Sequence, residues 1–194
     1  MTTTDARRKL IEAALSFMET GHTPTTRELT ERAGVNIAAV NYHFKSKDNL
    51  LAQAIDHAVL GRFQTWVDSE LTDAADTAAA ARLRRLLRYL VDAHRDLPHI
   101  CRAQIQNLAL KDEPERAAEV LAALLIDLLT ELAPEWPDRR RRVAAVSLQA
   151  SVTFLSLFHP RFTPMTGIPV DSAADRDAYV DALLQNHGLP AGAL

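Results

Sequence analysis

The residues best suited to a defined chemistry lie between Thr25 and Lys47. From Asn36 to Lys47 the chain carries Lys45, Lys47 and His43 and no carboxylate. Lysine, asparagine, threonine and tyrosine side chains, together with backbone amides, are the groups that hydrogen-bond DNA phosphates and base edges. This segment therefore predicts a local positive surface that contacts double-stranded DNA.

Two short helices joined by a tight turn must position these side chains. Thr25 begins a Thr-x-x-Glu capping box, and Gly34 is expected to end the first helix because a sharp reversal often needs a positive φ. Asn36 is expected to cap the second helix, with Val40 and Phe44 turned back into the core. This is the geometry of a helix-turn-helix, whose second helix fits a major groove about 12 Å wide.

The outward face of the second helix supplies most of the candidate DNA contacts. Ala38 is small enough for the helix to lie close to base edges, and Asn41 is suited to hydrogen-bond a base edge or a phosphate. On any single feature, such as the capping box, the favoured interpretation would be a structural three-helix unit without a DNA role. The predicted DNA-binding residues are Thr25, Thr26, Asn36, Ile37, Ala38, Asn41, Tyr42, His43 and Lys47.

Composition limits the class of protein. Apolar residues make up 47% of the chain and charged residues 24%, a balance typical of a soluble globular protein. The net charge is −3, so DNA affinity must come from a local surface. The only cysteine, Cys101, cannot form an intramolecular disulfide and is expected to be a small buried side chain. Met1–Lys9 lacks the apolar segment of a signal peptide, and Val120–Leu132 is too short to span a bilayer, so a cytoplasmic protein is expected.

Apolar residues recur at three- and four-residue spacing, and no segment shows sustained alternation, so the predicted fold is all-α. The helix that begins at Lys47 is expected to outrun the N-terminal bundle, so its far end must pack against something else. About nine helices are expected, over residues 4–19, 25–33, 36–43, 47–71, 79–98, 100–110, 114–132, 138–158 and 175–186, with 160–169 irregular.

No catalytic or metal-binding pattern accompanies the helix-turn-helix. The seven histidines form no His-x-x-x-His pair, and Pro98 separates His94 from His99, both expected to be solvated or in a loop. Neither a glycine-rich phosphate loop nor a Gly-x-Ser-x-Gly elbow occurs. The run Arg139 to Arg142 is interpreted as a solvated first helical turn rather than a second DNA patch. The sequence therefore predicts no enzyme activity, no cofactor and no metal.

One long stretch, Thr25 to Ile55, closely resembles the DNA-binding segment of TetR-family transcriptional regulators; it reads TTRELTERAGVNIAAVNYHFKSKDNLLAQAI. With the first helix, the resemblance covers roughly residues 5–60. The matching points are Ala33-Gly34-Val35, the aromatic Tyr42-His43-Phe44, and Lys45-Ser46-Lys47 followed by Leu50-Leu51.

The resemblance implies a helix-turn-helix DNA-binding domain over 1–48, linked by the long helix 47–71 to a helical ligand-binding and dimerisation domain over 49–194. It also implies a homodimer that binds a near-palindromic operator and is released by a small effector, most simply a repressor. Tilting of the long helix by the effector would change the spacing of the two DNA-binding heads. The rival interpretation is a helical small-molecule-binding protein or enzyme with a vestigial DNA-binding module.

Polar residues within or beside mostly apolar helical stripes are the candidate effector contacts. Apolar walls with a few polar anchors fit a small-molecule site, so an apolar or amphipathic effector is expected. For each residue the alternative, a place on a helix exterior, stays open. The candidates are His94, Gln104, Gln106, Asn107, Gln149 and Thr153.

Small and aromatic residues at helical spacing near the C-terminus are the candidate dimer interface. Two helices from each subunit would form a two-fold four-helix arrangement. The alternative, that these side chains form the core of one chain, stays open. The candidates are Val146, Ala150, Phe154, Leu155, Phe158, Tyr179 and Leu183.

Overall fold

Helices make up all the regular structure in the part of the chain that the computed structural model describes, which is residues 3–67, 78–99, 101–102 and 117–190. The all-α prediction is therefore confirmed. The helix expected over 100–110 and the candidate contacts Gln104, Gln106 and Asn107 lie outside these residues. No helix among the described residues is long and apolar enough to cross a membrane.

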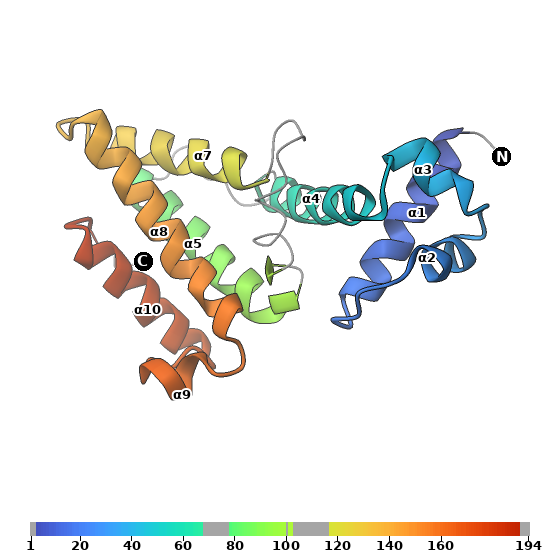
Figure 1. Ribbon diagram of the computed structural model, residues 1–194. Helices are drawn as coiled ribbons and strands as arrows, with labels where there is room; N and C mark the ends of the chain where they lie inside the picture. Colours follow the sequence, from blue (N-terminus) through green and yellow to red (C-terminus); the bar gives the residue numbers. More distant parts are fainter. Residues whose placement is uncertain (1–2, 68–77, 100, 103–116, 191–194) are drawn as a thin grey trace.

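The helices form a small unit and a larger one (Figure 1). We call the small unit the head; it consists of α1, α2, α3 and the first half of α4. The body consists of the end of α4 with the later helices. The bounds are α1 Thr3–Met18, α2 Thr26–Ala33, α3 Ala38–Phe44, α4 Lys47–Trp66, α5 Ala79–Asp96, α7 Ala117–Leu132, α8 Asp138–Phe158, α9 Phe162–Thr166 and α10 Ala173–Asn186.

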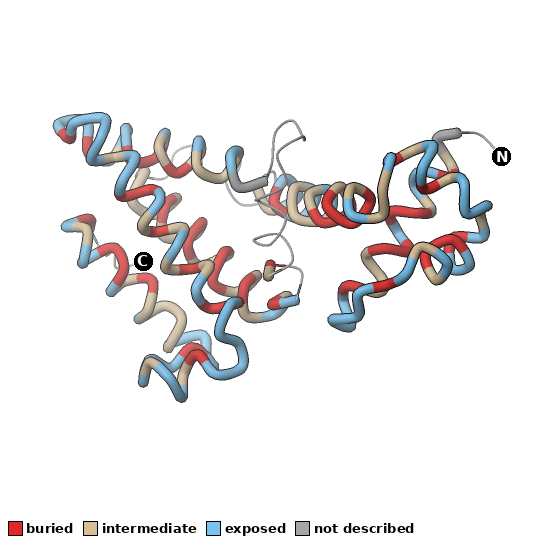
Figure 2. The backbone as a smooth tube through the Cα atoms, in the orientation of Figure 1, coloured by how far each residue is buried: buried red, intermediate tan, exposed pale blue. Residues whose placement is uncertain are grey.

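The head has a core of its own. Leu10 of α1, Leu29 of α2 and Phe44 of α3 are almost completely buried together with Leu50 and Ile55 of α4. These residues recur at helical spacing in the sequence, which is why the predicted inward faces of the first four helices are confirmed. The body has a second and larger core, which α5, α7, α8 and α10 build (Figure 2).

One helix belongs to both cores. The first half of α4 buries Leu50 and Ile55 in the head, whereas Phe63 near its end is buried in the body. Trp66 stacks on Tyr89 of α5, with ring centroids 4.7 Å apart. The expectation that the far end of this helix packs against another element is therefore confirmed, while its expected continuation over 68–71 lies outside the described residues.

Two C-terminal elements differ from expectation. The segment 160–169, expected to be irregular, contains the short helix α9, which Phe162 anchors in the body core. The last helix begins at Ala173 rather than Asp175, because Ser172 and Asp175 form a reciprocal capping box. The Ser172 hydroxyl accepts from the Asp175 amide at 3.1 Å and donates to its carboxylate at 2.6 Å.

His94 is buried, contrary to the expectation of a solvated histidine. α5 continues to Asp96, so the histidine stays within the helix and faces α8. Its Nδ1 lies 2.9 Å from the Ser156 hydroxyl oxygen, and that hydroxyl donates to the Thr153 carbonyl, so Nδ1–H is the donor. Desolvation lowers the pKa of His94 to about 4, which keeps the imidazole neutral at pH 7.

His94 makes the stability of the protein depend on pH. The unfolded chain takes up a proton near the ordinary pKa of 6.5, whereas the folded chain resists it until about 4. Between these values the unfolded state binds more protons, so the free energy of unfolding falls as the pH falls, by about 2 kcal/mol between pH 7 and pH 5. Urea unfolding of wild type and His94→Gln at the two pH values measures this, because glutamine does not titrate.

The matched control is His57→Gln on α4, whose side chain is exposed. It should keep the wild-type pH dependence. A smaller slope from His187, whose pKa burial also lowers, should remain in all three proteins. Equal pH dependence in wild type and His94→Gln would contradict the prediction.

Candidate nucleic-acid interface

The start of α2 is fixed by the capping box that the sequence predicts. The Thr25 hydroxyl accepts from the Glu28 amide at 3.2 Å. The Thr25 amide and hydroxyl each donate to the Glu28 carboxylate at 2.7 Å. The hydrogen bond from the Thr25 amide lowers the pKa of the Glu28 carboxyl most, and the bond from the Thr25 hydroxyl lowers it further. The hydroxyl proton of Thr25 is thus used inside the cap, so this residue positions α2 and does not offer its proton to a phosphate.

Gly34 makes the turn between α2 and α3. Its φ of 64° and ψ of 37° lie in the left-handed region, which glycine adopts without steric cost. The next amide, that of Val35, donates to the Thr30 carbonyl at 3.0 Å and closes the end of α2. Val35 packs partly buried against the head core.

Asn36 holds the beginning of α3. Its side-chain oxygen accepts from the Ala38 amide at 2.8 Å, and its carbonyl accepts from the Ala39 amide at 2.9 Å. The expected cap thus takes the form of a two-residue side-chain turn, with Ile37 in the N-cap position. On the inner side of α3, Val40 and Phe44 are each 1% exposed, which confirms that they face the core.

The outer side of α3 gathers the residues that the sequence assigns to DNA. Ile37 is 58% exposed and Tyr42 77% exposed, so both of these large side chains face outward. Tyr42 packs edge-on against His43, with ring centroids 4.9 Å apart. Asn36, Ile37, Ala38, Asn41 and Tyr42 are all exposed, whereas Thr26, His43 and Lys47 are partly buried at the margins.

Lys45 is a further residue at this surface that the list of candidate contacts omitted. It is exposed, and its backbone has a φ of 64° and a ψ of −34°, the only positive φ at a non-glycine among the described residues. Its amide donates to the Asn41 carbonyl at 3.1 Å and closes α3. Ser46 caps α4, and its hydroxyl accepts from the Asn49 amide at 3.1 Å. The sequence signal for Lys45 is its place as the single residue between the buried Phe44 and this cap.

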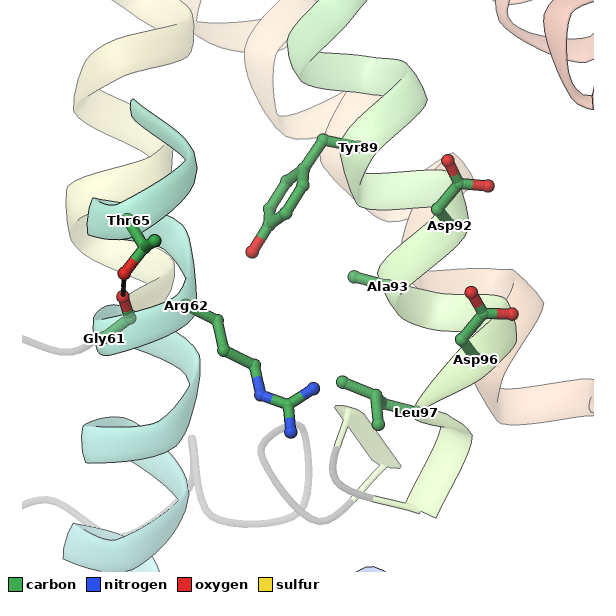
Figure 3. Close-up of a pocket in the computed structure, with 8 residues that line it drawn as sticks. All are labelled: Gly61, Arg62, Thr65, Tyr89, Asp92, Ala93, Asp96 and Leu97. Atoms are coloured by element: carbon green, nitrogen blue, oxygen red, sulfur yellow. Dashed lines mark hydrogen bonds between the residues drawn. The ribbon is translucent and has the colours of Figure 1, made fainter. Parts of the chain in front are cut away.

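Three of the candidate effector contacts, His94, Gln149 and Thr153, lie within the described residues. His94 is buried and is connected to Thr153 through Ser156, and Gln149 is partly buried on α8. A cavity of about 480 Å³ lies between α4 and α5 (Figure 3). In the sequence, the charged residues of this cavity have the pattern of ordinary solvated helix surfaces. They come together only because α4 and α5 approach each other. It is lined by Gly61, Arg62, Thr65, Tyr89, Asp92, Ala93, Asp96 and Leu97.

Some of the candidate dimer residues on α8 and α10 face the body core, and others face outward. Leu155 and Leu183 are buried in the body core, so for these two the intrachain alternative holds. The cause is the rotation of about 100° per helical residue, which turns Leu155 inward although its neighbour Phe154 is exposed. Tyr179 is partly buried, and its hydroxyl donates to the Ser151 carbonyl at 2.9 Å. Val146, Ala150, Phe154 and Phe158 are exposed.

Acidic residues, cysteine and histidine do not gather into a candidate metal site within the described ranges. The buried Cys101 has its thiol 3.7 Å from the Ala93 carbonyl oxygen, and burial raises its pKa to about 12. The expectation of a buried cysteine is thus confirmed, and the thiol stays protonated.

The strained backbone at Lys45 predicts that a glycine variant at this position is more stable than an alanine variant. Lys45→Gly should be more stable than Lys45→Ala by about 1 kcal/mol, because glycine adopts a positive φ without the steric cost that a Cβ imposes. Both variants lack the amine, so each serves as the other's control for lost charge. Urea unfolding midpoints at one pH measure the difference, and an alanine variant as stable as the glycine variant would contradict it.

Known proteins share both the head and the overall fold. Residues 10–54 match the family described as "Bacterial regulatory proteins, tetR family". A 46-residue stretch is 52% identical to the "HTH-type transcriptional dual regulator CecR" of Shigella flexneri, covering 23% of this chain and 21% of that protein. A solved structure from Pseudomonas aeruginosa PAO1, for which a role as transcriptional regulator has been suggested, superposes with a TM-score of 0.64. It shows 24% identity and covers 96% of this chain and 91% of its own, and so supports the fold. Residues 10–54 are therefore similar to the tetR family of bacterial regulatory proteins, and the chain as a whole shares the fold of the solved structure.

Proposed function

We propose that this protein is a transcriptional regulator that binds operator DNA by placing α3 in the major groove. The observation that carries the proposal is the exposed row on α3, where Ile37, Asn41 and Tyr42 face outward although the head core is complete without them. Large apolar or aromatic side chains left open beside amides and basic groups are typical of an interaction surface.

The exposed row divides by chemistry into two kinds of contact. Asn41 is the residue suited to hydrogen-bond a base edge, and Ile37 and Ala38 are suited to pack against a thymine methyl group. Tyr42 and Asn36 are suited to phosphates, as are Thr26, His43 and Lys47 at the margins. Since the whole chain carries a net charge of −3, the attraction comes from this local surface and weakens steeply with salt.

A second copy of the chain is the proposed occupant of the open face of α8. Val146, Ala150, Phe154 and Leu157 recur at spacings of three and four residues and are all exposed, so they form one apolar stripe. Pairing two such stripes about a two-fold axis would cover them. A two-fold dimer presents two copies of α3, which is what a near-palindromic operator requires.

Control by a small effector completes the proposal. Residues 1–48 would bind DNA, and residues 49–194 would bind the effector and the second subunit. Because α4 is buried in both cores, an effector that changes the packing of its far end would alter the spacing of the heads. We infer that the effector releases the DNA and that the protein acts as a repressor and not as an enzyme.

Substitutions on α3 and at the start of α4 should separate base readout from phosphate contact. Against DNA selected from a random pool by the wild-type protein, Asn41→Ala should lower affinity about 5- to 100-fold and change the preferred base at one position of each half-site. Lys47→Ala should weaken binding to all sequences and reduce the slope of log affinity against log salt by about 2 for a dimer. Fluorescence anisotropy with labelled duplexes over a salt series measures both effects.

The matched control is Arg142→Gln, which also removes one positive charge but lies at the start of α8, where Arg142 pairs with Asp138 at 2.7 Å. It should bind DNA like wild type. If no DNA sequence is enriched from the pool, or if Asn41→Ala and Lys47→Ala bind like wild type, the rival with a vestigial head is favoured.

The α8 stripe should control the oligomeric state. Val146 is 63% exposed within one chain, so Val146→Glu leaves the protomer folded but places two carboxylates at the proposed two-fold contact. Sedimentation velocity at micromolar concentration should show a dimer for wild type and a monomer for the variant. Ala123→Glu, at an exposed position on α7, is the control and should remain dimeric. A monomeric wild type would exclude the proposed dimer.

A further inference from the structure

The cavity between α4 and α5 combines two polar groups with an apolar wall. Figure 3 shows the Tyr89 hydroxyl pointing into the space between the helices and Arg62 extending across it toward Leu97. Both are hydrogen-bond donors, and Arg62 is a cation at every ordinary pH. Burial raises the pKa of Tyr89, so its hydroxyl keeps its proton. The groups that enter the cavity therefore suit an acceptor with negative charge.

The two carboxylates at the rim do not oppose this polarity. Asp92 and Asp96 point away from the space that holds Arg62 and Tyr89 (Figure 3). Asp92 pairs with Arg176 at 2.7 Å and also with Arg88. Asp96 pairs with Arg95 at 2.8 Å. Each rim carboxylate is thus paired with an arginine, and Arg62 is the one cation among the residues that line the cavity.

The rest of the wall is apolar and aromatic. Tyr89 stacks on Trp66 with an interplanar angle of 23°, which presents a flat aromatic edge to the cavity. Gly61 adds no side chain, and Ala93 and Leu97 add apolar surface on the α5 side. A volume of about 480 Å³ is within the range of small-molecule sites, which span about 300–1,000 Å³.

Arg62 has a partner that a ligand could replace. Its Nη2 lies 3.7 Å from the Glu19 carboxylate, just beyond the end of α1. The two side chains are 52% and 54% exposed, so the pair is screened by solvent and weak. A ligand carboxylate in the cavity can form a shorter, bidentate contact with the same guanidinium.

The cavity also adjoins the place where the body touches the head. Leu97, one of its lining residues, packs against the head core. Two residues further on, His99 lies so close to Gly21 that a Cβ on that glycine would be 2.9 Å from the imidazole Cε1. Gly21 has a φ of 73° and follows α1, so the end of α1 meets both His99 and Arg62.

We propose that the cavity between α4 and α5 binds a small organic anion with a flat apolar body, and that the anion takes Arg62 from Glu19 and so loosens the end of α1. The regulatory half of this inference rests on the proposed DNA-binding function, whereas the binding half does not. By thermodynamic linkage, an anion that weakens operator binding must itself bind less tightly when operator is present.

Three probes with the same ring system test the binding half on the full chain without DNA. Isothermal titration calorimetry at low salt compares 1-naphthoate, uncharged 1-naphthamide and cationic 1-naphthylmethylamine. Naphthoate should bind at least about tenfold more tightly than the other two, the size expected for one charge-assisted hydrogen bond. Absence of naphthoate binding up to about 10 mM, or equal binding of the three probes, would overturn the proposal.

Variants assign the effect to Arg62 and its competition with Glu19. Arg62→Gln should lose about tenfold or more in naphthoate affinity, and Arg62→Lys should recover part of it. Glu19→Gln should raise naphthoate affinity by about two- to fivefold, because the competing carboxylate is gone. Arg142→Gln, remote from the cavity, should match wild type. Unchanged affinity in Arg62→Gln or a loss of affinity in Glu19→Gln would exclude this site.

A second measurement separates the inference from the proposed function. Naphthoate should lower the affinity of wild type for its selected DNA and leave Arg62→Gln unaffected. If naphthoate discriminates by charge but the protein selects no DNA, the anion site stands and the proposed function fails. If DNA is selected and naphthoate binds at Arg62 without changing DNA affinity, the loosening of α1 is wrong.

Discussion

The structure depends on a single helix that is buried in two cores. α4 places Leu50 and Ile55 in the head and Phe63 in the body, and these three side chains are almost completely buried. A helix of 20 residues is a rod about 30 Å long, held straight by its own hydrogen bonds. Repacking around Phe63 therefore moves the head, whereas a flexible linker would absorb it. Close packing makes such a shift a step between discrete arrangements rather than a gradual deformation.

A rod alone would leave the head free to swing, and the contacts at the end of α1 limit this. Leu97 packs on the head core, His99 approaches Gly21, and Arg62 pairs with Glu19. These contacts are small, local and partly exposed, so each contributes little to stability. The head is thus held firmly along α4 and weakly at α1. An arrangement with one strong and one weak attachment is suited to regulation, because a ligand of moderate affinity can remove the weak one.

Local signals in the sequence predicted the head almost completely. The Thr25 capping box and the Gly34 reversal each depend on residues within four positions of one another, and both occur as expected. The body was predicted less well, because helical periodicity identifies an apolar face but not the element that covers it. The burial of His94 depends on Ser156, which is 62 positions away. The cavity likewise depends on the approach of α5 to α4, and nothing local in either helix marks Arg62 as different from other surface arginines.

The outer face of α3 carries the residue types that the stability of the head requires least. Val40 and Phe44 complete the head core, so stability does not require an isoleucine at 37 or a tyrosine at 42, and both would be less costly as small polar residues. At the end of the same helix, Lys45 occupies a backbone conformation that glycine would adopt with less strain. Local choices that oppose stability tend to concentrate at functional sites. Three such choices next to Asn41 and Lys47 are not explained by the packing of the head, which is why this face is the candidate interaction surface.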